Sequence, residues 1–155
     1  AAWPQKTWLF DRYISVINKC IKKYDLFPIL IGGSTDNVCN SIKNILGEKL
    51  IDLHGKTSLR ESIAIISKSE FVIGSDTGLV HAAEALNISA ISILGPTTTE
   101  TGAGLFNKKS ITVEDKDLWC RPCSQNGSIP CYRKEQYCMT NIDVKNVMNA
   151  VNGLM

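Results

Sequence analysis

The sequence has little of two features that assign many proteins to a class at once, namely an excess of charge of one sign and a long apolar run. Its formal net charge is only +2 over 155 residues, which is too small to argue for a nucleic-acid partner. Basic residues such as Lys19, Lys22 and Lys23 are scattered along helical stretches, which favours a solvated face. No apolar run approaches the ~20 residues needed to cross a bilayer. We therefore expect a cytoplasmic protein without a nucleic-acid partner.

The sequence also lacks the two common nucleotide-binding fingerprints, GxGxxG and GxxxxGK[ST]. The turn at 32–36 (GGSTD) follows an apolar run and precedes a helical pattern, but it has neither spacing. Two interpretations of this turn stay open. Either Asp36 caps the next helix of a flexible turn, or its carboxylate accepts hydrogen bonds from ribose hydroxyl groups.

What the sequence does contain is a regular alternation of strand and helix signals with short connections. Apolar runs that do not alternate with polar residues predict a parallel sheet covered on both faces. With 44% hydrophobic residues, the chain can bury one full core. We predict a single α/β domain with a three-layer, Rossmann-like parallel sheet. The expected helices are 8–24, 36–46, 58–67, 79–86 and 143–151, and the expected strands are 27–31, 50–53, 71–73, 89–94 and 109–113.

The most informative stretch is 71–86, FVIGSDTGLVHAAEAL. A strand, a polar turn and a helix start of this kind present unpaired N–H groups and the positive end of a helix dipole to an anion. Gly78 lets a phosphate approach the backbone, Thr77 offers a hydroxyl group, and His81 lies one turn along the same face as a donor. A diphosphate would repel a carboxylate, so Asp76 is expected to accept hydrogen bonds from sugar hydroxyl groups. Helix capping by Asp76 is the alternative.

A second polar loop, 95–102 (GPTTTETG), follows the next expected strand. Ligands of open α/β sheets bind beyond the carboxyl ends of the strands, so Thr97 and its neighbours are candidates for ligand contact beside Asp76. The alternative is a loop in which several hydroxyl groups compete as helix caps.

Four of the six cysteines fall close together, at Cys120, Cys123, Cys131 and Cys138. Closed structural zinc sites take four thiolates, although this spacing differs from a standard zinc ribbon. Disulfides are disfavoured in a reducing compartment. Structural zinc, free thiols and redox chemistry all stay open. We expect the loop to be structural, because it lies far along the chain from every candidate ligand contact.

These residues resemble the carboxyl-terminal half of glycosyltransferase family 9, the ADP-heptose heptosyltransferases. The segment 76–81 (DTGLVH), followed by AAEALN, by GPT at 95–97 and by TG at 101–102, is similar to the family pattern. PQKTW at 4–8 is similar to its lysine–x–tryptophan segment. The resemblance covers nearly the whole chain. The sequence departs from the family at Asp36, where glutamate is usual, and at 1–3, where AAW replaces hydroxyl residues.

The resemblance implies a role for each candidate residue. A diphosphate would contact Lys6 and 77–78, ribose would contact Asp36, the sugar would contact Asp76 with His81 beside it, and adenine would lie near 57–59. No catalytic residue is expected, because the family's base belongs to the amino-terminal half. The full donor-binding set is Lys6, Asp36, Thr57, Leu59, Asp76, Thr77, Gly78, His81 and Thr97.

The resemblance further implies that 1–155 forms one nucleotide-sugar-binding domain, the donor half of a two-domain B-type glycosyltransferase whose acceptor domain lies outside this sequence. The intact enzyme would transfer heptose from ADP-heptose to the inner core of lipopolysaccharide, without a metal cofactor for catalysis. Its lipid-linked acceptor is compatible with peripheral contact at the inner face of the inner membrane. This chain alone is expected to be inactive. The alternatives are another B-type glycosyltransferase, a nucleotide-sugar epimerase, or a non-catalytic interaction module stapled by cysteines.

Overall fold

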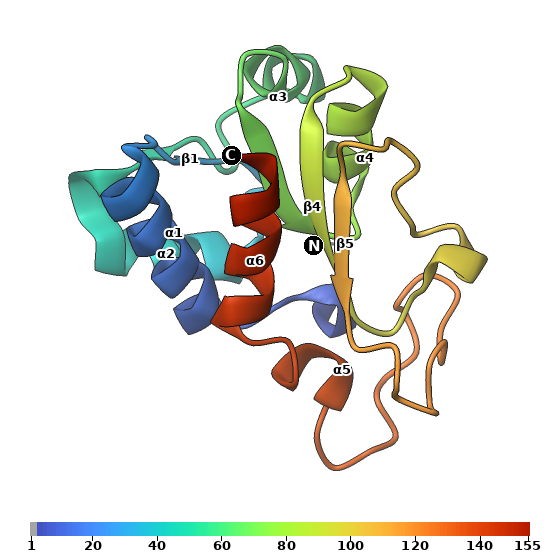
Figure 1. Cartoon of the computed structure of the whole chain (residues 1–155). Helices are drawn as coiled ribbons and strands as arrows, with labels where there is room; N and C mark the ends of the chain where they lie inside the picture. Colours follow the sequence, from blue (N-terminus) through green and yellow to red (C-terminus); the bar gives the residue numbers. More distant parts are fainter. Residues whose placement is uncertain (1–2) are drawn as a thin grey trace.

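Helices and short parallel strands alternate along the chain in the computed structural model, which describes residues 3–155 (Figure 1). Ala1 and Ala2, which belong to one of the two departures from the family pattern, lie outside the described residues. The strands are β1 (Ile29–Leu30), β2 (Ile51–Asp52), β3 (Phe71–Ser75), β4 (Ser89–Leu94) and β5 (Ile111–Glu114). The α-helices are α1 (Phe10–Tyr24), α2 (Asn37–Leu46), α3 (Leu59–Ile66), α4 (Gly78–Ala85), α5 (Tyr137–Thr140) and α6 (Val144–Leu154), and the short 3-10 helices are η1 (Pro4–Lys6), η2 (Gly47–Lys49) and η3 (Thr99–Thr101).

The strands pair in parallel throughout the described part of the chain. β4 lies between β3 and β5, with Ile91 opposite both Ile73 and Ile111, and β1 pairs with β2 in a second sheet. Every residue of β4 after Ser89 is buried, as expected for a parallel strand covered on both faces. The predicted α/β fold is confirmed, and its hydrogen-bonded strands divide between two sheets.

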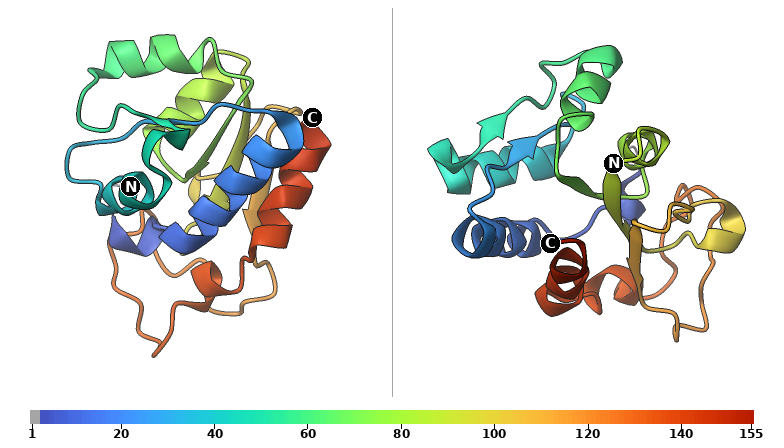
Figure 2. Two further views of the ribbon diagram at one scale, coloured as in Figure 1. Left: turned by 90° about the vertical axis from the view of Figure 1, so that its left-hand side faces the viewer. Right: turned by 45° about the horizontal axis from the view of Figure 1, so that its top comes forward.

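Helices cover both faces of the β3–β4–β5 sheet (Figures 1 and 2). α4 packs on β3 and β4 with α3 beside it, and α6 packs on β4 and β5 with α1 against it. Side chains of β4 alternate between the two layers. Ile91 and Ile93 belong to the main core with Val147 of α6, and Ala90 belongs to a smaller core with Val80 of α4.

Trp8 connects the start of the described chain to a segment near its end. Its side chain is 1% exposed, and its indole Nε1 donates a hydrogen bond to the carbonyl oxygen of Ile142 at 3.0 Å. The guanidinium of Arg12 donates to the carbonyl of Thr140 at 2.7 Å in the same region. The turn η1, which carries Lys6, ends two residues before Trp8.

The predicted elements are present, and the differences lie at their ends. The strands expected at 27–31 and 50–53 shorten to β1 and β2, and α1 begins at Phe10, two residues later than predicted. Gly47, with φ of 58°, closes α2 as predicted for a C-cap glycine. The unpredicted elements, α5 and the three 3-10 helices, are too short to show an apolar period.

No helix described in residues 3–155 is both long and apolar enough to cross a membrane. The longest of them, α1, has 15 residues, whereas a bilayer core requires about 20.

Candidate functional site

Asp76, directly after β3, is the centre of a largely buried polar cluster. Its side chain is 11% exposed, and Oδ2 accepts hydrogen bonds from Lys6 Nζ at 2.8 Å and from Thr97 Oγ1 at 3.2 Å. Its Oδ1 lies 3.2 Å from Nε2 of His81. The structure therefore brings together four candidate residues that come from three separate segments of the chain.

The start of α4 borders this cluster. Thr77 is the N-cap residue of α4, but its side chain makes no capping hydrogen bond. The Asp76 carboxylate bonds Lys6, Thr97 and His81 instead of capping the helix. A Cβ atom added at Gly78 would meet nothing within 4 Å. Open space thus lies beside the first turn of the helix, where backbone N–H groups lack partners within the helix and favour an anion.

The loop that carries Thr97 is held by the buried Arg121, whose side chain is 3% exposed. Its guanidinium donates to the carbonyl of Thr97 at 2.9 Å and to that of Gly95, and it pairs with Glu114 Oε2 at 2.8 Å. Sequence reasoning missed this role. No periodicity marks an arginine that binds carbonyl groups 24 and 26 positions away.

Asp36 lies at the other pair of strands, in the loop that follows β1. It occupies the N-cap position of α2, but its side chain makes no capping bond; Oδ2 instead accepts from the N–H of Gly33 at 2.9 Å. The N–H of Gly55 donates to the carbonyl of Gly32 at 2.8 Å. The loops that follow β1 and β2 therefore lie side by side.

The loop after β2 leads to the two residues predicted near adenine. The hydroxyl of Thr57 lies 2.9 Å from that of Ser62, and Leu59 begins α3 with 67% of its surface exposed. Within residues 3–155, no hydrogen bond joins Thr57 to the Asp76 cluster. The structure thus places the predicted adenine residues on the segment after β2, next to the loop of Asp36, and outside the hydrogen-bonded cluster around Asp76.

Sequence reasoning missed a hydrogen-bonded cluster around Asp52, in the segment that leads to Thr57. Asp52, at the end of β2, bonds His54 Nδ1 through Oδ1 and Lys56 Nζ through Oδ2 at 3.1 Å, while His54 Nε2 lies 3.0 Å from Asn40 Oδ1. Burial alone would raise the pKa of Asp52, but the hydrogen bonds from His54 and Lys56 hold it at about 2.

We expect Asp52 to stabilise the fold fully above about pH 4 and to lose this contribution as the pH falls towards 2. Its pKa of about 2 lies below the ordinary 3.8, so the unfolded chain takes up the proton first as the pH falls. Urea unfolding at pH 6 and at pH 3 tests this prediction. Asp52→Asn should shrink the difference in unfolding free energy between the two pH values, and an unchanged difference would contradict the assignment.

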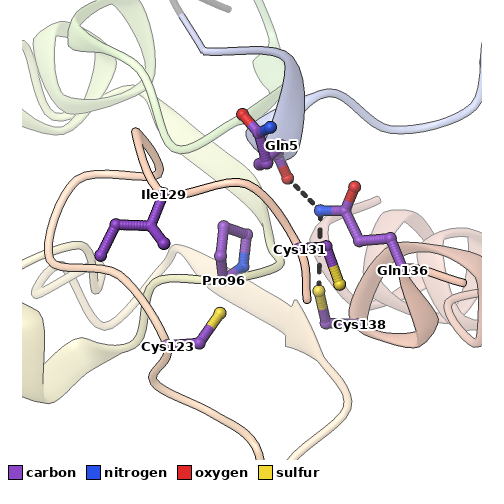
Figure 3. A pocket seen from close by; sticks show the side chains of 7 residues that line it. All are labelled: Gln5, Pro96, Cys123, Ile129, Cys131, Gln136 and Cys138. Atoms are coloured by element: carbon purple, nitrogen blue, oxygen red, sulfur yellow. Dashed lines mark hydrogen bonds between the residues drawn. The ribbon is translucent and has the colours of Figure 1, made fainter. Parts of the chain in front are cut away.

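The loop from Cys120 to Cys138, here called the cysteine loop, lies against the segments of the Asp76 cluster. The N–H of Cys123 donates to the carbonyl of Pro96 at 3.2 Å, and Gln136 Nε2 donates to the carbonyl of Gln5. A cavity of about 10 Å³, with room for about one water, lies between these segments. Figure 3 shows the side chains that line it: Gln5, Pro96, Cys123, Ile129, Cys131, Gln136 and Cys138. Far along the chain from Lys6 and Thr97, the loop is adjacent to them in space.

All four cysteines of this loop are free thiols. Burial raises the pKa of the Cys123 and Cys138 thiols, which favours the neutral thiol over the thiolate that a metal binds. Residues 3–155 contain no group of three or more His, Cys, Asp or Glu side chains arranged to hold a metal ion. The cysteines as arranged do not fit a metal site, and structural zinc stays a prediction.

Comparison with known proteins identifies the family. The sequence profile of glycosyltransferase family 9 (heptosyltransferase) matches residues 1–132. Lipooligosaccharide heptosyltransferase 2 of Campylobacter jejuni is 25% identical over 154 residues, covering 97% of this chain and 47% of the relative. The enzyme of the same name from Haemophilus influenzae is 29% identical over 112 residues, covering 70% of this chain and 32% of the relative. This chain thus spans about half or less of the length of these relatives.

Solved structures with the same fold lead to the same class. The E. coli ADP-heptose lipopolysaccharide heptosyltransferase II superposes with a TM-score of 0.79 at 20% identity, over 99% of this chain and 43% of that one. The iron-containing heptosyltransferase TibC, in complex with ADP-D-beta-D-heptose, superposes with a TM-score of 0.70 at 18% identity, over 99% and 43%. The fold is that of one half of a B-type glycosyltransferase. The chain belongs to glycosyltransferase family 9, the heptosyltransferases.

Proposed function

We propose that this chain is the donor-binding domain of an enzyme that transfers heptose from ADP-heptose to the inner core of lipopolysaccharide. The observation that carries this proposal is the buried Asp76 cluster, in which Lys6 pairs with Asp76 directly before the N-cap residue of α4. Membership of the heptosyltransferase family and the likeness to a structure holding ADP-D-beta-D-heptose support the choice of donor. The acceptor site and the catalytic base belong to a second domain, outside this chain.

The transfer step assigns separate roles to the two domains. An acceptor hydroxyl oxygen bonds to the anomeric carbon of heptose while the bond from that carbon to the diphosphate breaks. The bonding electrons leave with ADP, and the acceptor proton passes to the base in the other domain. In this domain, Lys6 Nζ and the first-turn N–H groups of α4 stabilise the charge that develops on the departing diphosphate. We assign this stabilisation to these groups and not to a metal ion.

Asp76 holds Lys6 in place and takes part in sugar recognition. Its contact with Lys6 at 2.8 Å offsets the carboxylate charge, so that a diphosphate can lie nearby. An ionised carboxylate has about four lone-pair sites, and Lys6, Thr97 and His81 occupy three of them. The remaining site accepts a hydrogen bond from a heptose hydroxyl group.

The nucleoside portion of the donor extends towards the loops after β1 and β2. Asp36 accepts hydrogen bonds from the ribose hydroxyl groups, and adenine packs near Thr57 and the exposed Leu59 at the start of α3. The Gly55–Gly32 hydrogen bond supports this assignment, because it holds the two loops together.

We expect the isolated chain to bind ADP weakly, yet more tightly than UDP or GDP, and to show no turnover of ADP-heptose, since half of the interdomain site is missing. Calorimetry with the three nucleotides measures this preference. Leu59→Ser should reduce it, whereas Phe106→Ser, at a position that is 78% exposed on another loop, should not. Binding of UDP as tight as that of ADP would remove the adenine assignment. An interaction module would not distinguish ADP from inorganic phosphate.

The partners and location of the intact enzyme follow from the same proposal. The acceptor is a lipid-linked saccharide, reached through the other domain by peripheral contact at the cytoplasmic face of the inner membrane. Metal analysis of protein purified without added metal tests structural zinc in the cysteine loop: about one zinc ion per chain would support it, and well under one would agree with the free thiols of this structure. Since TibC contains iron, the metal analysis should include iron as well.

A further inference from the structure

The cysteine loop contacts the stem of Lys6 through a glycine. A Cβ atom added at Gly127 would lie 2.5 Å from Cγ of Lys6 and 2.8 Å from its Cδ. Real Cβ atoms do not approach other atoms so closely, so the bare backbone of Gly127 forms the surface on which the Lys6 stem lies. Gly127 has φ of +83°, in the left-handed region that favours glycine.

The turn that presents Gly127 is held from within the loop. Ser124 is 5% exposed, and its Oγ accepts hydrogen bonds from the N–H of Gly127 at 2.9 Å and from that of Ile129 at 3.5 Å. Gln136 donates to the carbonyl of Gln5, beside Lys6. The loop thus contacts both the side chain of Lys6 and the backbone next to it.

We propose that Gly127 is a positioning residue of the donor site, which acts by supporting the stem of Lys6. A lysine ammonium sits on a flexible four-carbon stem, and holding it in one rotamer costs conformational entropy. Here the stem packs against a fixed backbone turn, the side chain is 13% exposed, and Nζ lies 2.8 Å from Asp76. Lys6 is thereby placed before the ligand arrives. This inference rests on the proposed role of Lys6 in diphosphate binding.

Gly127→Ala tests the proposal, with Gly47→Ala as the matched control. Both glycines have positive φ, but a Cβ at Gly47 would meet nothing within 4 Å. Both variants should therefore lower the melting temperature, and only Gly127→Ala should displace Lys6. We expect its ADP affinity, measured by calorimetry, to fall about tenfold, the lower end of the loss for a hydrogen bond to a charged group. Gly47→Ala should stay within about twofold of the parent chain.

A double-mutant cycle separates failure of this inference from failure of the proposed function. Lys6→Ala should lower ADP affinity by itself, and Gly127→Ala should then have no further effect. If Lys6→Ala leaves ADP affinity unchanged, the proposed function is wrong at this residue. If Lys6→Ala lowers it but Gly127→Ala has no effect, or has the same effect in both backgrounds, Gly127 does not act through Lys6.

Ser124→Ala keeps the inference testable if Gly127→Ala does not fold. It removes the hydrogen-bond acceptor of the turn without adding an atom beside Lys6. We expect about a threefold loss of ADP affinity in the parent chain and none in the Lys6→Ala background. A loss of equal size in both backgrounds would overturn the inference.

Discussion

Asp76→Asn should weaken binding of ADP-heptose by roughly 10- to 100-fold more than it weakens binding of ADP. Asparagine keeps the shape of the side chain but lacks the negative charge that would attract a heptose hydroxyl. A hydrogen bond to a charged group contributes about 1.5–3 kcal/mol. ADP has no heptose to lose this contact, and its diphosphate no longer faces the carboxylate.

The ratio of the two affinities is the decisive quantity, because Asp76 also pairs with the largely buried Lys6. Leaving that ammonium without its partner lowers stability, so the melting temperature of the variant should fall. A fall in folded fraction weakens both ligands alike, whereas loss of a sugar contact weakens only ADP-heptose. Calorimetry with both ligands on the same preparation separates the two effects.

Asp36→Asn provides the matched control for Asp76→Asn. The proposed partner of Asp36 is ribose, which ADP and ADP-heptose share, so this substitution should weaken both ligands by the same factor. A sugar-specific loss at Asp36, or an equal loss of both ligands at Asp76, would contradict the assignment of ribose to one carboxylate and heptose to the other.

Much of this site could be predicted from the sequence because its central part is local. The residues of 71–86 follow one another as strand, turn and helix, so periodicity alone places Asp76 and Gly78 at the carboxyl end of a strand. What the sequence does not show is how that carboxylate is occupied. Its donors Lys6 and Thr97 lie 70 and 21 positions away, and only the folded chain brings them to it.

The cysteine loop shows the limit of sequence reasoning more sharply. Its spacing draws attention to the sulfur atoms, and distance along the chain argues that the loop stands apart from the donor site. In the structure its contacts with that site are made by residues without a motif, such as Gly127 against Lys6 and Arg121 at the carbonyl of Thr97. Packing against a backbone and donation to a carbonyl leave no pattern in one sequence.

The fold shows the same division between pattern and tertiary contact. Apolar runs indicate that strands are present, but pairing decides where each strand ends. The run at 27–31 contributes only two residues to β1, and Phe27 is 63% exposed. β4, which has a partner on each side, keeps the full predicted length of 89–94.

The largest loss of stability should come from Arg121→Met, at about 3–5 kcal/mol of unfolding free energy, the range for removing one partner of a buried ion pair. The substitution leaves the Glu114 carboxylate, whose side chain is 9% exposed, without its main partner. It also removes the donor to the carbonyl groups of Gly95 and Thr97. Urea unfolding monitored by circular dichroism measures the change.

Lys116→Met is the matched control, because Lys116 pairs with the same glutamate from the surface. Its Nζ lies 3.9 Å from Glu114 Oε1, and its side chain is 80% exposed, so its loss should cost only about 0–1 kcal/mol. Equal losses of unfolding free energy in the two variants would mean that burial does not account for the contribution of Arg121 to stability.

Adding Glu114→Gln to Arg121→Met separates the ion pair from the loop that carries Thr97. With the carboxylate neutralised, the double variant should regain part of the lost stability, because no buried charge is left unpaired. It should not regain all of the lost stability, because the carbonyl groups of Gly95 and Thr97 still lack the donor that Arg121 provided. An unsatisfied buried acceptor costs about 1–3 kcal/mol. Full recovery would show that Arg121 only neutralises Glu114. Partial recovery of stability is the result expected if Arg121 also holds the loop that carries Thr97.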